Sequence, residues 1–464
     1  MNRESRITNY ENAAVIAETI AAWLASSTPD RIPARARATA RRLLVDVTGL
    51  CVAARHQDYV MATLRTVDPG PCTAIGHALS IDAFSAALVN GTAAHGEDFD
   101  DTFEGGPVHS GAVVVPALLA ICEREGLGGD RLLAGITSGV ELLCRLSLVA
   151  PTATHKAGFH PTAVFGAVAA AAGVAAALNL PADAAASALG IAGSMASGII
   201  EYLAEGTWTK RMHAGWAAQS GIRAALLARG GFLGPRTVFE GVHGLYRAFA
   251  PSVAPDFTPL VSDLGSRWVM DDVAFKPYAC GTMTQPFVDC AIQLADSGVK
   301  DDDIDEIVCE VAEGTVHRLW EPLASKQRPP TPYAAKFSTP YCMAVGFLDG
   351  KAGFEQFTAE RVANERVLAL ASKIRYRINA ADEYPRNFTG HLRARLRNGA
   401  TRQCRQPHMR GGVHAPLTDA ELDTKFMDNA RYGGWTPQRA TQMLGLIRGL
   451  FDVGRLDMLT DLRS

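Results

Sequence analysis

Residues 95–109 read HGEDFDDTFEGGPVH, a run rich in acids and histidines between two apolar segments, AFSAALVNGTAA at 83–94 and SGAVVVPALLAIC at 110–122. Burying carboxylates between two core segments costs free energy unless each is paired. Burial also shifts the pKa values of such groups, and shifted groups are what acid–base catalysis uses. These fifteen residues, called the acidic motif below, are therefore the first candidate for the place where the chain does chemistry.

The composition indicates a globular protein in a reducing compartment. The chain has 464 residues, too many for one ordinary compact core, so we expect two domains. A net charge of −3 gives no general electrostatic reason to expect nucleic acid or an anionic membrane as a partner. The nine cysteines are scattered, odd in number and never spaced as CxxC. This favours a cytoplasmic protein with buried thiols over a disulfide framework or a zinc site.

Two segments bear on export and membrane insertion. The first fifteen residues, MNRESRITNYENAAV, have no apolar run behind their arginines, so we do not expect a signal peptide. Residues 157–182 carry no formal charge, but they include His160 and two prolines and consist largely of alanine. Because alanine drives membrane insertion weakly, we expect a tightly packed internal helix there.

Up to about residue 250 the apolar residues recur every three to four positions, which predicts helices. The predicted helices are 12–24, 36–54, 82–94, 111–124, 131–149, 162–180, 182–203 and 214–229. Alanine and glycine at facing positions let helix axes approach closely, so we expect a compact bundle. After about residue 415 the helical pattern returns.

Between about 265 and 405 apolar and polar residues alternate, as in half-buried strands. The predicted strands are IDEIVCEVA at 304–312, KIRYRINA at 373–380, and a hairpin over 391–405 that turns at Asn398-Gly399. Helices are predicted between them at 286–296 and 341–348. Arg393, Arg395 and Arg397 fall on one strand face, which we interpret as solvated.

The predicted fold class is therefore mainly α. A large all-helical domain is built from both termini, residues 1–265 and 406–464. A smaller α+β lid domain, residues 266–405, is inserted into it. An insertion of this kind can move as a lid over a site between the two parts.

The acidic motif allows three interpretations. Asp98 and Thr102 are four apart, so on a continuing helix they would share one face. Asp100, Asp101 and Glu104 match the DDxxE pattern of magnesium-dependent isoprenoid enzymes, but the second metal motif of those enzymes is not found here, which makes this alternative remote. The third possibility is a helix cap with surface acids.

Three further segments place ionisable residues at helix starts. His160 precedes Pro161, a residue favoured at the first helical position, and near the positive end of a helix an imidazole tends to stay neutral and able to act as a base or donor. A purely structural histidine is the alternative. Lys210 and Arg211 begin another helix, where two cations are unfavourable and a ligand carboxylate would relieve the cost; the alternative is an exposed basic turn. Lys276 precedes a Gly-rich turn before a helix, a weak anion-binding signal.

Taken in order, these segments resemble the MmgE/PrpD family, which includes 2-methylcitrate dehydratases, cis-aconitate decarboxylases and iminodisuccinate epimerases. The resemblance covers nearly the whole chain. It runs through NGTAAHGEDFDDT, HSGAVVVPALLA, GFHPTAVFGAVAAAA, EGTWTKRMHAGWAAQSG, FKPYACG, KFSTPYCMAVGFLDG and PLTDAELDTKF. It implies a large helical domain, a smaller α+β lid and, usually, a homodimer.

The resemblance also implies an active site between the two domains. The catalytic residues expected from it are Asp98, His109, His160, Lys210 and Tyr341, and the expected substrate-binding residues are Thr102, Arg211, Lys276 and Gln285. Two departures stand out. The motif histidine, His109, is shifted by a residue, and the stretch 280–286 lacks the histidine that decarboxylases and dehydratases of the family carry.

The family reactions move a proton at a carbon next to a carboxylate, and the resulting enolate needs cations and donors to hold its charge. We therefore expect a metal- and cofactor-independent enzyme acting on a small di- or tricarboxylate. A lyase is favoured, because most named members eliminate water or carbon dioxide. An epimerase of an iminodisuccinate-like dicarboxylate is the alternative, and a non-catalytic helical scaffold is the remaining class.

Overall fold

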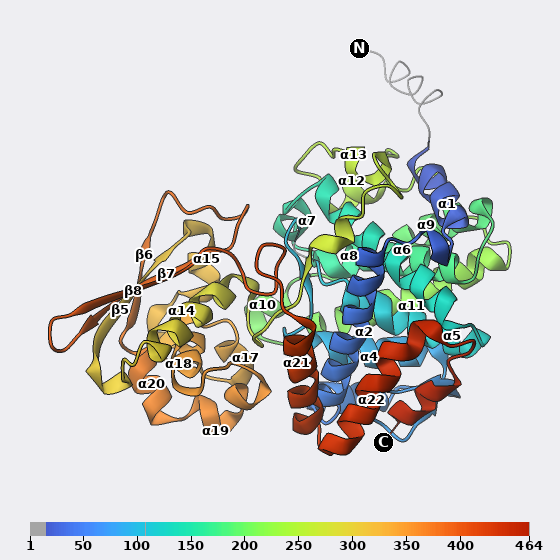
Figure 1. Cartoon of the computed structure of the whole chain (residues 1–464). Coiled ribbons are helices and arrows are strands. Elements are labelled where there is room, and N and C mark those ends of the chain that lie inside the picture. Colours follow the sequence, from blue (N-terminus) through green and yellow to red (C-terminus); the bar gives the residue numbers. More distant parts are fainter. Residues whose placement is uncertain (1–14, 107, 464) are drawn as a thin grey trace, which may run out of the picture.

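The computed structural model describes residues 15–106 and 108–463, and over these residues the protein is mainly helical, as predicted. The segment for which no signal peptide is expected lies almost wholly in residues 1–14, outside the described residues. Figure 1 shows a large helical body and, beside it, a smaller part that carries a four-stranded sheet. The lid role of the smaller part and its boundaries at 266 and 405 stay predictions.

The helical body is built from both ends of the described chain. Its longer helices are α1 (Ile16–Ser26), α2 (Ala34–Ala54), α4 (Ala83–His95), α5 (Gly111–Glu125), α6 (Gly129–Val149), α8 (Pro161–Ala177), α9 (Ala182–Met195), α11 (Thr209–Arg229), α21 (Asp419–Tyr432) and α22 (Pro437–Gly449). Shorter helices are α3 (Asp58–Leu64), α7 (Ala153–Lys156), α10 (Tyr202–Glu205), α12 (Leu245–Phe249) and α13 (Thr258–Val261). The C-terminal α21 packs on α2, as Figure 1 shows.

Small residues allow α11 to pack closely against α4 and α8, as expected from the Ala- and Gly-rich sequence. A Cβ atom added to Gly91 of α4 would lie 2.6 Å from the Cα of Gly215 on α11. One added to Gly221 would lie 2.4 Å from the Cβ of Ala170 on α8. This close packing fixes the C-terminal end of α4 beside the N-terminal end of α11.

The segment predicted as a helix over 182–203 is helical only as far as Met195. The chain then extends, and the backbone N–H of His160 donates a 2.8 Å hydrogen bond to the carbonyl of Gly198. Gly198 has φ 111°, a conformation that side chains with a Cβ rarely adopt and that a helix cannot contain. A continuous helix is therefore wrong here.

Helix α6 is the one described helix that is long and apolar enough to cross a membrane. Its most apolar window is 94% buried inside the protein, which is typical of a core helix. The helix also contains Glu141 and Arg145, which form an ion pair. The alanine-rich segment singled out in the sequence forms α8, and every residue of that helix is buried.

The smaller part contains a sheet with strand order β6-β5-β7-β8. Strand β5 (Ile304–Val311) is parallel to β6 (Ile374–Ile378) and antiparallel to β7 (Gly390–Leu396), which pairs with β8 (Thr401–Gln406). The β7–β8 turn has Gly399 at φ 83°, in line with the predicted Asn-Gly hairpin. The helices of this part are α14 (Gln285–Asp296), α15 (Glu313–Leu319), α16 (Leu323–Gln327), α17 (Pro332–Ala335), α18 (Thr339–Asp349), α19 (Ala359–Val362) and α20 (Glu365–Ala371).

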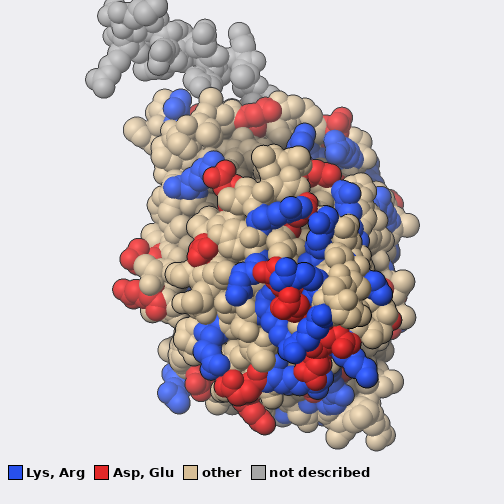
Figure 2. All heavy atoms as spheres, turned by 90° about the vertical axis from the view of Figure 1, so that its left-hand side faces the viewer, with Lys and Arg blue, Asp and Glu red and all other residues tan. Residues whose placement is uncertain are grey.

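One face of this sheet is exposed and carries interleaved cations and anions, as Figure 2 shows. Arg377 pairs with Glu310, and Arg395 pairs with Asp305 at 2.7 Å. The arginines of the β7 face are exposed. The interpretation as a solvated face agrees with this arrangement.

A two-residue strand pair that the sequence does not reveal ties the acidic motif to a distant segment. Strand β3 (Thr102–Phe103) pairs antiparallel with β4 (Val273–Ala274). Lys276 follows β4 by two residues, and Asp100 precedes β3 by two. The pairing therefore brings Lys276 to the acids of the motif.

Candidate active site

The acidic motif leaves the helical path as soon as α4 ends at His95. Asp98 has φ 55°, a left-handed conformation that aspartate tolerates better than most residues but that cannot continue a helix. Thr102 lies in β3 and is buried there. The expectation that Asp98 and Thr102 share one helix face is therefore wrong.

Each acid of the DDxxE pattern has its own protein partner. Asp100 accepts from His95, and Glu104 accepts from the backbone N–H of Val413 at 3.2 Å. Asp101 accepts from the backbone and hydroxyl of Ser110 and from the N–H of Gly111, which caps the start of α5. The helix-cap interpretation thus holds for Asp101, but as a fully buried cap rather than as a surface acid.

Asp98 lies at the centre of a buried set of donors. Its carboxylate pairs with the ammonium of Lys210 and accepts a 3.1 Å hydrogen bond from the hydroxyl of Tyr333. Lys276 donates to its backbone carbonyl at 3.1 Å. Burial alone would raise the pKa of Asp98, but Lys210 and Lys276 hold it well below its usual range. Asp98 is therefore an ionised residue whose carboxylate is held by Lys210 and whose backbone carbonyl is held by Lys276.

Four histidines lie side by side next to these cations. The ring of His95 is stacked on His160 with centroids 5.4 Å apart and lies 5.0 Å from His109. His160 contacts His213, with 3.2 Å between their Nδ1 atoms. Nδ1 of His95 is 2.7 Å from Oδ2 of Asp100. As predicted, His160 is the residue before the first turn of α8, with Pro161 at the first helical position.

Three of these histidines, His109, His160 and His213, are held neutral at pH 7. Burial lowers the pKa of His109 to about 3, although Asp100 opposes the shift. Burial and the neighbouring His95 and Lys210 lower the pKa of His213 to about 4. The same causes put the pKa of His160 well below its usual value. Neutral imidazoles can accept a proton or donate a hydrogen bond.

One subset of these residues has the chemistry of a metal site. His95, Asp100 and His109 each offer a ligand atom, and these atoms lie within 4.8 Å of one another. Imidazole nitrogens and a carboxylate oxygen form a common ligand set for divalent transition ions. In the protein as described, the Nδ1 of His109 also lies 2.7 Å from the carbonyl of Asp101.

The cations at the start of α11 face acids of the chain itself. Lys210 pairs with Asp98, and Arg211 lies 3.6 Å from Glu97. Both cations are buried. The interpretation as an exposed basic turn is therefore wrong. Two cations at the start of a helix are unfavourable because of the helix dipole, and carboxylates of the acidic motif offset this cost.

Two of the residues expected in the site lie elsewhere. The hydroxyl of Tyr341 donates to the backbone carbonyl of Gln356 at 2.6 Å, inside the smaller part. The amide of Gln285 bonds to the backbone of Tyr278 and Cys280 and closes their turn. Tyr333, which sequence reasoning missed, reaches Asp98 instead. The other expected residues meet around the acidic motif, with Thr102 in its β3 strand.

A cavity of about 290 Å³ opens beside this cluster. The residues that line it include Glu97, Arg211, Tyr333 and Lys336, together with Phe357, Thr358 and Ala359 at the start of α19 and Tyr432 of α21. Because Tyr333 also contacts Asp98, which pairs with Lys210, the cavity adjoins the buried acidic motif. It gives a small ligand space next to the reactive groups.

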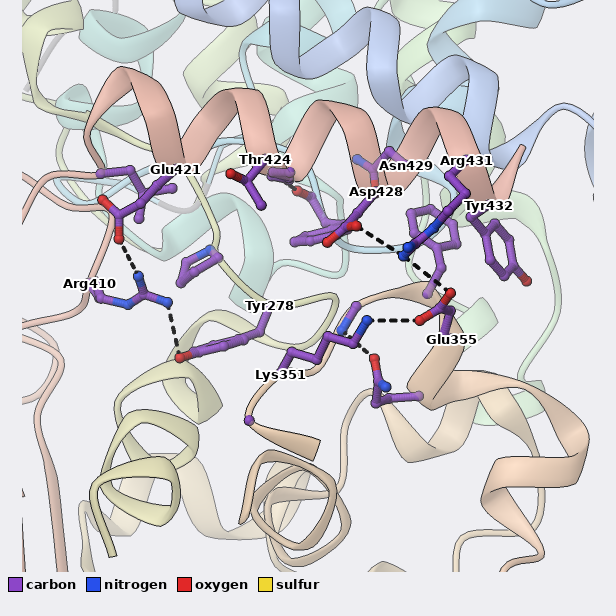
Figure 3. A pocket seen from close by; sticks show the side chains of 18 residues that line it. Tyr278, Lys351, Glu355, Arg410, Glu421, Thr424, Asp428, Asn429, Arg431 and Tyr432 are labelled. Carbon is purple, nitrogen blue, oxygen red and sulfur yellow. Dashed lines mark hydrogen bonds and ion pairs between the residues drawn. The ribbon is translucent and has the colours of Figure 1, made fainter. Parts of the chain in front are cut away.

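A second cavity of about 220 Å³ lies between α21 and the smaller part (Figure 3). Its side chains pair with one another: Arg431 with Glu355 and Asp428, and Arg410 with Glu421. The pair between Arg431 and Glu355 links α21 to the smaller part. The lining contains none of the ionisable residues of the acidic motif, whereas Glu97 lines the first cavity, so we interpret this cavity as a seam between the parts rather than the candidate active site.

Two family models that match the sequence define the class of protein. The MmgE/PrpD N-terminal domain matches residues 18–258, and the MmgE/PrpD C-terminal domain matches residues 278–444. The chain belongs to the MmgE/PrpD family.

Several of its relatives are named cis-aconitate decarboxylase. The chain is 26% identical to one from Aspergillus terreus over 100% of this chain and 97% of the relative. It is 29% identical to the human enzyme over 81% of this chain and 78% of the relative. A cis-aconitate decarboxylase-like protein of Aspergillus oryzae is 26% identical over 87% of this chain and 88% of the relative. These matches confirm the prediction of an enzyme of the lyase class.

Proposed function

We propose that this protein is a lyase that acts on a small di- or tricarboxylate and moves a proton at the carbon next to a carboxylate, without a metal or an organic cofactor. The observation that carries the proposal is the buried juxtaposition of Lys210 and Lys276 at Asp98 with neutral histidines beside them. The names of the relatives support decarboxylation as the first reaction to test.

The two lysines supply the charge that the reaction needs. Taking a proton from, or adding one to, a carbon next to a carboxylate passes through an enolate that carries an extra negative charge. The ammonium groups of Lys210 and Lys276 converge on Asp98, and Lys276 is fully buried. Because electrostatic interactions are stronger away from water, these cations stabilise the enolate more than solvent would.

The histidines, rather than Asp98, are the groups that we propose to move the proton. His109 and His160 are neutral at pH 7, so each has a lone pair that can take a proton. The carboxylate of Asp98 is already engaged by the ammonium of Lys210 and the hydroxyl of Tyr333. Its role in the proposal is to hold Lys210 in place, with the hydroxyl of Tyr333 as a second donor.

The smaller part would close the site. Tyr333 and Lys336, both from the smaller part, contact Asp98 and Glu97 of the helical body. Closure of a lid of this kind excludes water and completes the set of polar groups around the substrate. We propose that the enzyme opens and closes at these contacts, and that it functions as a homodimer in the cytoplasm.

A substrate panel tests the proposal. Citrate-, aconitate- and aspartate-like acids are incubated with the wild-type protein and with Lys210→Met, and alkene formation, CO2 release and optical rotation are followed. The expected result is alkene or CO2 from at least one acid, lost in the variant. Loss of optical rotation without an alkene would replace the lyase by the epimerase, and no change in any acid would overturn the proposal.

A further inference from the structure

Two cations, Arg211 and Lys336, line the cavity of about 290 Å³, and both have hydrogen-bond donors that the protein does not use fully. Arg211 is held between the rings of Tyr59 and Tyr333, whose centroids lie 4.4 and 4.3 Å from its guanidinium carbon. Stacking of this kind fixes the plane of the guanidinium. Its Nε is buried and has no hydrogen-bond partner among the described residues. Arg211 is thus a rigid cation with an unused donor.

Lys336 is the second cation of this wall. It is almost fully buried, with its ammonium 4.5 Å from the centroid of the Phe357 ring. Its only strong polar partner among the described residues is Glu97, at 3.1 Å, since the carbonyl of Ala279 is 3.4 Å away. A buried ammonium has three protons to donate, so Lys336 also has donor capacity left for a ligand.

Glu97 stands between these two cations. Its carboxylate is 3.1 Å from Lys336 and 3.6 Å from Arg211. Two positive charges and one negative charge leave the wall with a net charge of one positive unit. One carboxylate group of a ligand would neutralise this charge, and a second carboxylate at the same wall would leave an excess negative charge.

We propose that this wall is the subsite for the remote carboxylate of the substrate, and that Glu97 is a specificity-determining residue that restricts the site to dicarboxylates. One carboxylate binds at Lys210 and Lys276, and the other at Arg211 and Lys336. A third carboxylate would meet Glu97, and like charges in a buried pocket repel strongly. The inference rests on the function proposed above, because it assigns the two ends of a polycarboxylate.

The test compares two unreactive probes, succinate with two carboxylates and tricarballylate with three. Their dissociation constants are measured by calorimetry for the wild type, for Glu97→Gln and for Lys336→Gln. Wild type is expected to prefer succinate. Glu97→Gln, which removes the negative charge but keeps the shape, is expected to move the ratio toward tricarballylate by about tenfold.

Lys336→Gln is expected to move the same ratio in the opposite direction, because the wall loses a positive charge. It keeps the inference testable if Glu97→Gln does not fold, which circular dichroism would reveal. Glu104→Gln is the matched control, since its carboxylate also belongs to the acidic motif but bonds to Val413. Its ratio is expected to equal that of the wild type.

Two negative results are distinguishable. If the wild type binds neither probe and turns over no polycarboxylate, the proposed function is wrong. If it binds them but the ratio stays constant in Glu97→Gln and Lys336→Gln, the polycarboxylate function stands and the role of Glu97 is wrong.

Discussion

The hydroxyl of Tyr333 donates a 3.1 Å hydrogen bond to the carboxylate of Asp98, and this bond joins the smaller part of the molecule to the acidic motif. The two residues are 235 positions apart. The bond reaches a carboxylate that Lys210 already holds, in a residue whose backbone carbonyl accepts from Lys276. Tyr333 therefore completes the site from the side that we propose to be mobile.

Removing this hydroxyl should slow catalysis without unfolding the protein. A hydrogen bond to a charged group contributes about 1.5–3 kcal/mol, so Tyr333→Phe should lower kcat/KM by roughly ten- to a hundredfold. The ring stays packed on Arg211, so the melting temperature should change little. Steady-state kinetics with the best acid of the panel would measure the effect.

Tyr341→Phe is the matched control for that change. It removes a hydroxyl that bonds to the carbonyl of Gln356, so a loss of about 1 kcal/mol of stability and almost full activity are expected. A larger loss of activity in Tyr341→Phe than in Tyr333→Phe would restore Tyr341 as the tyrosine of the site.

Lys210 should matter for both stability and activity. Lys210→Met leaves the buried carboxylate of Asp98 without its closest cation, which typically costs about 3–5 kcal/mol. The double variant Lys210→Met/Asp98→Asn should regain much of this stability, because no unpaired charge remains. Neither variant should regain activity, since the cation that stabilises the enolate is missing. Thermal denaturation and kinetics of the two variants check both statements, and an active double variant would remove Lys210 from the mechanism.

The buried histidines should make the fold sensitive to acid. His213 has a pKa of about 4 and His109 of about 3 in the folded protein, both below the ordinary value of 6.5. Between these values the unfolded chain binds protons that the folded protein does not, so stability falls as the pH drops from about 7 toward 4. For His213 alone the loss is roughly 3 kcal/mol.

Melting temperatures measured from pH 7.5 to pH 4.5 would show this loss. The variant His213→Gln should have a shallower dependence on pH than the wild type. Equal slopes for the two proteins would show that His213 is not held neutral by the fold.

A chelator should leave the enzyme active. The proposal uses Lys210 and Lys276 as its cations, so dialysis against EDTA should not change kcat/KM. The contrary result, loss of activity that a divalent ion restores, would make His95, Asp100 and His109 a working metal site. Substituting Asp100→Asn would then be expected to abolish the restoration.

Periodicity predicted the long helices well because their apolar spacing extends over many residues. The predicted helix 131–149 corresponds to α6 (Gly129–Val149), and the predicted hairpin to β7 and β8. The conformation of the acidic motif was harder to predict from the sequence. The left-handed backbone of Asp98 and the two-residue β3–β4 pair depend on tertiary contacts, so no local sequence pattern predicts them.

The choice between the two tyrosines shows the same limit. The motif Thr-Pro-Tyr occurs twice within eleven residues, at 331–333 and at 339–341. Both copies start a helix, α17 and α18. Only the packing of the smaller part decides that the first copy reaches Asp98, whereas the second is buried against Gln356. The repeated motif therefore predicts a tyrosine near the site, but it does not distinguish Tyr333 from Tyr341.

The most direct test of the central claim follows the proton itself. Small di- and tricarboxylates are incubated with the enzyme in deuterated water, and their carbon-bound hydrogens are followed by NMR. The account predicts that at least one acid gains deuterium next to a carboxylate, together with an alkene product or released CO2, and that the variant Lys210→Met gives neither. If no acid exchanges a carbon-bound hydrogen with the wild type, the buried lysines and histidines around Asp98 do not carry out this chemistry.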